Sequence, residues 1–392
     1  MDTPTSNQQG GIPTTLKFKY QPSYSVKKDN MAALDFGIWD QYRYTEIQAA
    51  ASAADVYESH IRLAQLMEKV GFKQYHTIEH QGSYVGQIAS PTVLLAAIAQ
   101  HTTNLRLGTM IWQTPFHNPM RLAQEITMLD NLSRGRVEFG TGIGIHEHEF
   151  IRWGMDFTER QKMGEEALDI IKMAWTQERV TYHGKYWQFE EALPAPAPYQ
   201  KPHPPIWAAA HSPRALAFAA RNNYDVAQNI DIDSNMVKKF DYFRQVWKEC
   251  GHPGPMPRTL LMRTIYVAET DEKARAEAEA HVPIDFSLGR EFVINTRVGM
   301  GTSPRGVGNE ITPDIQERGR VFREVGKSYD FAVDNGIAVV GSPETVIKKI
   351  KEQQESMGLN VYIGNFHVGA MPMEQVTKSL KLFGEEVIPA FK

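Results

Sequence analysis

Apolar residues recur along this chain in two spacings that alternate with each other. Short apolar runs, such as 33–41 and 104–112, have the composition of β-strands, whereas 55–71 and 118–133 carry apolar residues three and four positions apart, as on one face of a helix. A strand followed by a helix occurs at least six times, which predicts parallel βαβ units with helices outside the sheet. Repeated right-handed crossovers of this kind produce either a doubly wound sheet or a closed (β/α)8 barrel.

Some segments depart from this alternation. Residues 193–205 form a proline-rich linker, and residues 1–30 are polar, as in a loose N-terminal tail. Residues 281–335 carry glycine, arginine and proline with little periodicity. We expect the last segment to be a mobile insertion on the face of the barrel that carries the site, with a plain surface loop as the alternative. The remainder, 31–392, is predicted to be a single domain interrupted by that insertion.

Composition and charge argue against several classes of protein. The 392 residues are 42% apolar and 22% charged, which allows a large core. The net charge is −4 without a basic stripe, so no nucleic-acid partner is expected. A single cysteine, Cys250, excludes an intrachain disulfide framework and a cysteine-rich zinc site. No run approaches the ~20 apolar residues of a membrane span, and a cytoplasmic protein without a membrane partner is predicted.

Three glycines at alternate positions, Gly140, Gly142 and Gly144, follow the predicted strand at 136–139. A dinucleotide-binding fingerprint requires GxGxxG between a strand and a helix, with an acidic residue about 20 positions later. This loop is GxGxG, and no clear helix follows it, which argues against such a site. Two interpretations remain open from the spacing: glycines that let a flat ring lie on the backbone, or a strained turn without a ligand.

Several motifs in the right order resemble one family. They are "HTIEHQG", "SPTVLLAAIAQHTTNLRLG", "HNPMRLAQEITMLDNLSRGRVEFGTGIG", "PIWAAAHSPRALAFAARNN" and "VVGSPETVIKKIK", within about 34–275 and 335–390. Together they are similar to the bacterial luciferase-like flavin-dependent monooxygenases. The resemblance implies a (β/α)8 TIM barrel, with a reduced flavin at the C-terminal ends of the strands. It also implies that Gly140 and Gly142 form the close-approach floor of the flavin pocket.

The same resemblance assigns roles at two strand ends. His80 corresponds to the histidine that assists proton transfer, which suits a side chain with an ordinary pKa of ~6.5. Glu79 is expected to orient a neighbour or the flavin edge, with a purely structural hydrogen bond as the alternative. Met110 and Ile111 match the pair that forms a cis peptide bond beneath the flavin ring. Gln81 stands where some relatives have a second histidine, which argues against a light-emitting reaction.

The flavin phosphate requires a separate anchor. Ile143 occupies the position where some members of the family carry an arginine. The predicted helix start at His211, Ser212 and Arg214 offers free backbone N–H groups, a hydroxyl and a positive charge. We therefore expect the phosphate there, with an ordinary helix N-cap at Ser212 as the alternative.

Four aromatic residues near strand ends are candidates for the wall of an apolar substrate pocket, although each would fit a core position equally well: Trp39, Tyr42, Trp112 and Phe116. No metal site is predicted. His76 and His80 are four residues apart, but they lie on a predicted strand. The run 146–149, "HEHE", lacks the HExxH order and is expected to be a solvated loop.

These observations predict a two-component monooxygenase that uses reduced FMN and O2 to oxygenate a small, largely apolar organic substrate. A separate NAD(P)H:flavin reductase would supply the reduced flavin, since the chain has no nicotinamide fingerprint. The family resemblance implies a homo-oligomer, expected to be a dimer. Two alternatives remain open: a deazaflavin-dependent dehydrogenase on the same barrel, and a flavin-binding protein without turnover.

Overall fold

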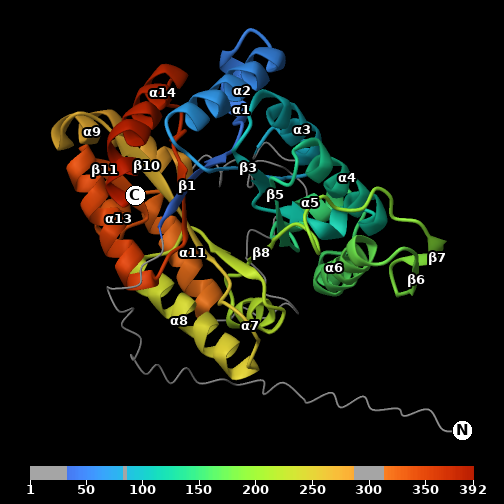
Figure 1. Cartoon of the computed structure of the whole chain (residues 1–392). Coiled ribbons are helices and arrows are strands. Elements are labelled where there is room, and N and C mark those ends of the chain that lie inside the picture. The colour runs from blue at the N-terminus through green and yellow to red at the C-terminus, as the bar shows by residue number, and fades with distance from the viewer. Residues whose placement is uncertain (1–32, 83–85, 287–312) are drawn as a thin grey trace, which may run out of the picture.

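The protein is a closed barrel of parallel strands surrounded by helices (Figure 1). The structure, a computed structural model, describes residues 33–82, 86–286 and 313–392. The barrel closes because the strand at Thr259–Val267 pairs with the strand at Asp225–Gln228 on one side and with the last strand, Val361–Asn365, on the other. The last strand in turn pairs with the first strand, Asp35–Asp40. This confirms the predicted (β/α)8 TIM barrel and excludes the doubly wound sheet. In chain order the barrel strands are β1 (Asp35–Asp40), β2 (Gln74–Thr77), β3 (Arg106–Thr109), β5 (Val137–Gly142), β8 (Ile206–Ala209), β9 (Asp225–Gln228), β10 (Thr259–Val267) and β12 (Val361–Asn365).

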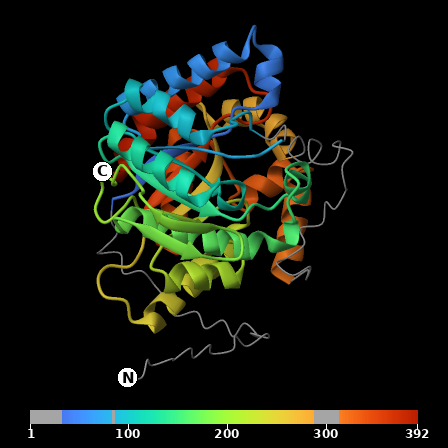
Figure 2. The same ribbon diagram turned by 90° about the vertical axis from the view of Figure 1, so that its right-hand side faces the viewer.

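The helices enclose the strands, as the view turned by 90° also shows (Figure 2). Their bounds are α1 (Tyr44–Ala49), α2 (Ala53–Lys69), α3 (Pro91–His101), α4 (Pro119–Leu132), α5 (Glu147–Arg152), α6 (Arg160–Thr176), α7 (Pro213–Arg221), α8 (Asp233–Cys250), α9 (Asp271–Ala278), α11 (Pro313–Val325), α12 (Tyr329–Asp334), α13 (Pro343–Met357) and α14 (Met373–Leu382). Helices α3, α7 and α13 begin at a Ser-Pro pair, since proline suits the first helical position. No helix in the described ranges combines the length and apolar character that crossing a membrane requires.

Among the described residues, four further strands lie outside the ring of eight, and two of them pair with barrel strands. The short strand β4 (Trp112–Gln113) pairs with β5, and β11 (Ala338–Gly341) pairs with the C-terminal half of β10. Strands β6 (Val180–His183) and β7 (Gln188–Ala192) form a separate antiparallel pair.

The barrel interior is filled with side chains. Its cluster comprises Trp207, Ala227, Leu260, Met262, Val361 and Ile363. Trp39, Met110 and Ile230 pack on this cluster and remain partly exposed. Because Met110 and Ile230 follow the ends of β3 and β9, they cover the core at the C-terminal ends of the strands, which we call the barrel mouth.

The opposite, N-terminal end of the barrel is closed by charged side chains. Glu138, the second residue of β5, has a side chain that is 0% exposed. It forms ion pairs with Arg106 and with Arg258, whose Nη2 lies 2.8 Å from Glu138 Oε2. Trp207 Nε1 donates to the same oxygen at 2.5 Å, and Arg258 also pairs with Asp225 at 2.7 Å. The buried carboxylate is thus surrounded by donors.

The predicted insertion is only partly described, since 287–312 lies outside the described residues together with the N-terminal tail. The expectation of a loop is wrong for 313–334, which forms α11 and α12. Arg318 on α11 donates to Asn229 Oδ1 at 2.9 Å. Since Asn229 directly follows β9, α11 lies on the mouth side of the barrel, as predicted. The part of the expected mobile insertion at 287–312 lies outside the described residues, and the expectation there stays a prediction.

Candidate active site

A histidine–carboxylate pair lies at the barrel mouth. His80 follows β2, and Glu149 lies on α5, the short helix after β5. His80 Nδ1 is 2.7 Å from Glu149 Oε1. The Glu149 side chain is 0% exposed, whereas that of His80 is 18% exposed. All barrel strands run parallel and end at the same edge of the barrel, and that common edge brings together two residues 69 positions apart in the chain.

The Glu79 carboxylate contacts several polar groups of the protein. It accepts hydrogen bonds from the Gln113 backbone N–H at 2.6 Å and from Gln81 Nε2 at 2.9 Å. His117 Nε2 lies 2.8 Å from Glu79 Oε1. The Gln113 side chain also connects Glu79 to Glu149, donating to the Glu79 carbonyl at 2.9 Å and to Glu149 Oε2 at 3.1 Å. The loops after β2 and β3 and helix α5 are therefore joined in one hydrogen-bonded network.

The network shifts the pKa values of its histidines in opposite directions. Burial alone would lower the pKa of His80, but the charge and hydrogen bond of Glu149 outweigh it, and the pKa is raised. Burial would raise the pKa of Glu149, yet its contact with His80 lowers it. Burial, assisted by the nearby His80, lowers the pKa of His146 to about 3. The pKa of His80 is thus raised, whereas that of His146, whose ring centre lies 5.2 Å away, is lowered.

The floor of the mouth is apolar. The peptide bond between Met110 and Ile111 is cis, as predicted from the resemblance. Trp39 Nε1 donates to the Met110 carbonyl at 3.3 Å, which holds the indole beside this bond. Ile230 adopts φ of 35°, a region that β-branched residues rarely enter and that occurs most often at functional sites. Together these residues offer a partly exposed apolar surface at the same end of the barrel as His80.

The glycines at the end of β5 make room for this floor. A Cβ at Gly140 would lie 2.1 Å from the Thr109 carbonyl oxygen, and one at Gly142 would lie 2.1 Å from Ile111 Cδ1. Their close approach is therefore to the chain's own segment around the cis peptide bond. A direct contact between Gly140 or Gly142 and a flavin stays a prediction.

The start of α7 is an ordinary capped helix. Ser212 Oγ accepts a hydrogen bond from the Ala215 backbone N–H at 3.2 Å. Arg214 is 56% exposed and lies 3.5 Å from Glu165 Oε1. His211 Nδ1 is 3.2 Å from Gln228 Oε1, and burial, together with the nearby Arg318, lowers the pKa of His211 well below its usual value. The N-cap is present, and phosphate binding at this helix start stays a prediction.

The four aromatic candidates for the substrate wall divide into two groups. Trp39 and Phe116 are partly exposed at the mouth, and the Phe116 ring lies 4.5 Å from that of Phe150. Tyr42 and Trp112 are 0% exposed within the main core. Trp112 stacks on Phe139, and Tyr42 stacks on His60. The burial of Tyr42 and Trp112 among protein atoms speaks against a lining role for them.

The sequence analysis missed most of the residues that surround His80. The expectation of a solvated loop at 146–149 is wrong, because this run begins α5 and Glu149 is fully buried. Gln113, His117 and His146 were not singled out. The available signal was position: 146–149 comes directly after the C-terminal end of a barrel strand, where catalytic side chains gather in this fold.

Comparison with known proteins agrees with this geometry. The family model for luciferase-like monooxygenases matches residues 34–360. The oxygenase component of flavin-dependent trigonelline monooxygenase from Acinetobacter baylyi is 28% identical over 347 residues, which cover 86% of this chain and 90% of that protein. Limonene 1,2-monooxygenase from Rhodococcus erythropolis is 26% identical over 376 residues, covering 93% of this chain and 88% of that protein.

Solved structures share the same barrel. A monooxygenase from Streptomyces bottropensis matches with a TM-score of 0.74 and 25% identity, covering 92% of this chain and all of that one. An F420-dependent secondary alcohol dehydrogenase, at 18% identity and a TM-score of 0.67, covers 92% of this chain and 100% of its own, and shares the fold alone. The match of the family model over most of the chain shows that this protein belongs to the luciferase-like monooxygenase family.

Proposed function

We propose that this chain is the oxygenase component of a two-component system, which uses reduced FMN and O2 to oxygenate a small, largely apolar organic substrate. The observation that carries the proposal is that the His80–Glu149 pair and the apolar floor lie at the same end of the barrel, its mouth. A flat heteroaromatic ring fits a floor of partly exposed apolar side chains, and a partly exposed histidine at its edge can move a proton.

Each group of residues has a separate task in this proposal. When bound, reduced FMN supplies the electrons that activate O2. Trp39, Met110 and Ile111 bear the ring and exclude water from one of its faces. The imidazole of His80 donates or accepts the proton, and Glu149 orients this imidazole through Nδ1. The helix start at Ser212–Arg214 holds the phosphate.

The need for a separate reductase has two supports. The chain lacks the glycine fingerprint of a nicotinamide site. The printed name of the trigonelline relative describes it as an oxygenase component. We therefore expect the reduced flavin to arrive from another protein, and the chain to act as a homo-oligomer, expected to be a dimer.

The test is a titration of the purified protein with reduced FMN, oxidised FMN and coenzyme F420, each followed by absorbance before and after air is admitted. Reduced FMN is expected to bind more tightly than oxidised FMN, and NADPH alone should not reduce the bound flavin. Reduction of bound FMN by NADPH without a partner contradicts the two-component proposal. Hydride transfer from reduced F420, without reactivity toward O2, would favour the dehydrogenase alternative.

A further inference from the structure

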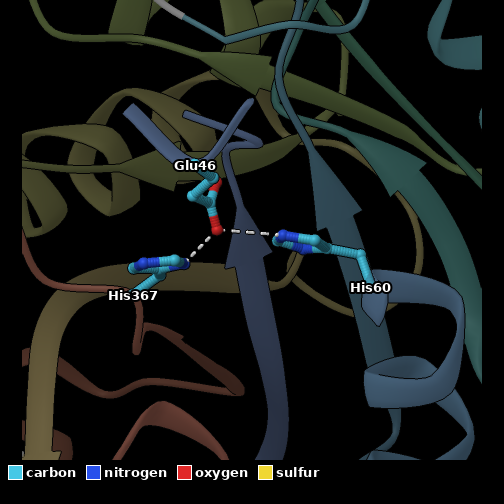
Figure 3. Close-up of side chains that lie close together, drawn as sticks. All are labelled: Glu46, His60 and His367. Carbon is cyan, nitrogen blue, oxygen red and sulfur yellow. Dashed lines mark hydrogen bonds and ion pairs between the residues drawn. The ribbon is translucent and has the colours of Figure 1, made fainter. Parts of the chain in front are cut away.

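A second cluster of histidine and carboxylate side chains lies beside β1 and β12. We propose that Glu46, His60 and His367, here called the triad, bind one divalent transition-metal ion of the class that accepts imidazole and carboxylate ligands, zinc foremost. Figure 3 shows the Glu46 carboxylate between the two imidazole rings. His60 Nε2 lies 3.1 Å and His367 Nδ1 2.5 Å from Glu46 Oε1, and the three ligand atoms all lie within 4.8 Å of one another.

The triad joins segments that are far apart in the chain. Glu46 lies on α1, His60 on α2, and His367 two residues after the end of β12. Their side chains are 12%, 0% and 8% exposed, respectively. An ion at this place would therefore be almost enclosed by protein, and it would tie both helices to the loop that follows the last strand.

Each imidazole is oriented through its other nitrogen. His60 Nδ1 lies 2.7 Å from Asp40 Oδ2, and His367 Nε2 donates to the Met371 carbonyl at 2.9 Å. Metal-bound histidines characteristically donate their second N–H to a carboxylate or a backbone carbonyl in this way. The remaining nitrogen of each ring then presents its lone pair toward Glu46 Oε1.

The contact between His367 and Glu46 is an ion pair that a bound metal ion could replace. His367 is 7% exposed, and its Nδ1, although only 2.5 Å from Glu46 Oε1, makes no hydrogen bond of normal geometry. A buried nitrogen of this kind normally has a partner. A metal ion bound by all three atoms would satisfy it.

The net negative charge around the triad favours binding of a divalent cation. Three carboxylates, Asp40, Glu46 and Asp285, lie in contact with the triad or with Arg43, which contributes one positive charge. With neutral imidazoles the group therefore carries a net charge of −2, and burying unbalanced charge is costly. One divalent ion balances it. Three protein ligands of the His2Glu type leave a fourth tetrahedral position, which water can occupy.

The experiment uses the metal alone, without flavin. Protein freed of metal by chelator dialysis is titrated with Zn²⁺ against a competing chromophoric indicator. The expected result is one ion per chain and a higher thermal midpoint in the presence of zinc. Asp40→Asn, which changes the partner behind His60, should weaken binding about 10–100-fold. His367→Ala removes a ligand and should weaken it at least as much, whereas the matched control His101→Ala, at an exposed helix position, should bind as the wild type does.

Absence of stoichiometric zinc binding by the wild type would overturn the proposal. Equal affinities for the wild type and His367→Ala would overturn it as well. If the variants do not fold, crystals of the wild type soaked in zinc test the proposal instead. Anomalous scattering at the zinc edge should show a peak between the three side chains, and no peak there contradicts the site. None of these results depends on the flavin reaction.

Discussion

The two ends of the barrel each bury a carboxylate completely, but they bind it with different partners. Glu138, at the N-terminal end, is held by Arg106 and Arg258. Glu149, at the mouth, is held by His80 and Gln113. Arginine keeps its proton throughout the physiological pH range, whereas histidine can release it. The first arrangement is a permanent charge pair, and the second contains a proton that can move.

We expect this difference to place stability and chemistry at opposite ends of one fold. At the N-terminal end every identified partner of Glu138 is a donor with a fixed charge state, which suits closure of the barrel. At the mouth the His80 ring remains partly exposed, at the same end of the barrel as the apolar floor. The same division is general in TIM barrels, where active sites occupy the C-terminal ends of the strands.

The largest expected effect is on turnover. His80→Ala should reduce product formation about 10²–10⁴-fold, the usual contribution of a general acid–base group, with flavin affinity nearly unchanged. The measurement is coupled turnover with an excess of reductase. His203→Ala serves as the control, because His203 lies before β8, at the N-terminal end of the barrel. Full turnover in His80→Ala would mean that His80 has only a structural role, and it would contradict the functional difference between the two ends of the barrel.

The next effect is on stability, at the other end. Glu138→Gln leaves two arginines without their common counter-ion and should lower the free energy of unfolding by about 3 kcal/mol. We take the low end of the usual range because Arg106 and Arg258 are 29% and 33% exposed and can be hydrated. Urea unfolding measures the change. A loss similar to that of an exposed pair, below about 1 kcal/mol, would show that this network does not support the barrel.

A smaller effect separates positioning from chemistry. Glu149→Gln should move the limb of the pH–rate profile that belongs to His80 to lower pH. Burial lowers the pKa of His80 and the Glu149 charge raises it, so removal of that charge leaves burial opposed only by the weaker influence of Glu79. The protonated form, favoured below the pKa, is then lost at a lower pH. NMR titration of His80 provides an independent measurement, and an unchanged pKa would contradict a positioning role for Glu149.

The smallest expected effect concerns the phosphate. Arg214→Ala should weaken FMN more than riboflavin, by about 1.5 kcal/mol, which is roughly tenfold. The low end of the range applies because Arg214 is largely exposed and already lies near Glu165. Glu165→Gln is the matched variant, and it should not weaken FMN. Equal losses of FMN and riboflavin affinity would leave the start of α7 as a helix cap only.

Local patterns in the sequence determined much of the fold. The alternation of strand and helix and the helix start at Ser212 depend on neighbouring residues, and both were predicted. The cis peptide bond at Met110–Ile111 was predicted through the family resemblance. Strand β9 was missed because it has only four residues, of which Val226 and Ala227 are the apolar pair. The helices α11 and α12 were missed because the helical spacing of their apolar residues is weak and because glycines and prolines precede them.

The sites required the closed barrel. His80 and Glu149 are 69 positions apart, and Glu46 and His367 are separated by most of the chain, so no local pattern relates them. Closure places the C-terminal ends of all strands on one rim, and only there do these side chains meet. The sequence by itself determined which segments become strands and helices, because that choice depends on local spacing. The tertiary structure decided which charged groups share a partner, because that depends on which strand ends become neighbours.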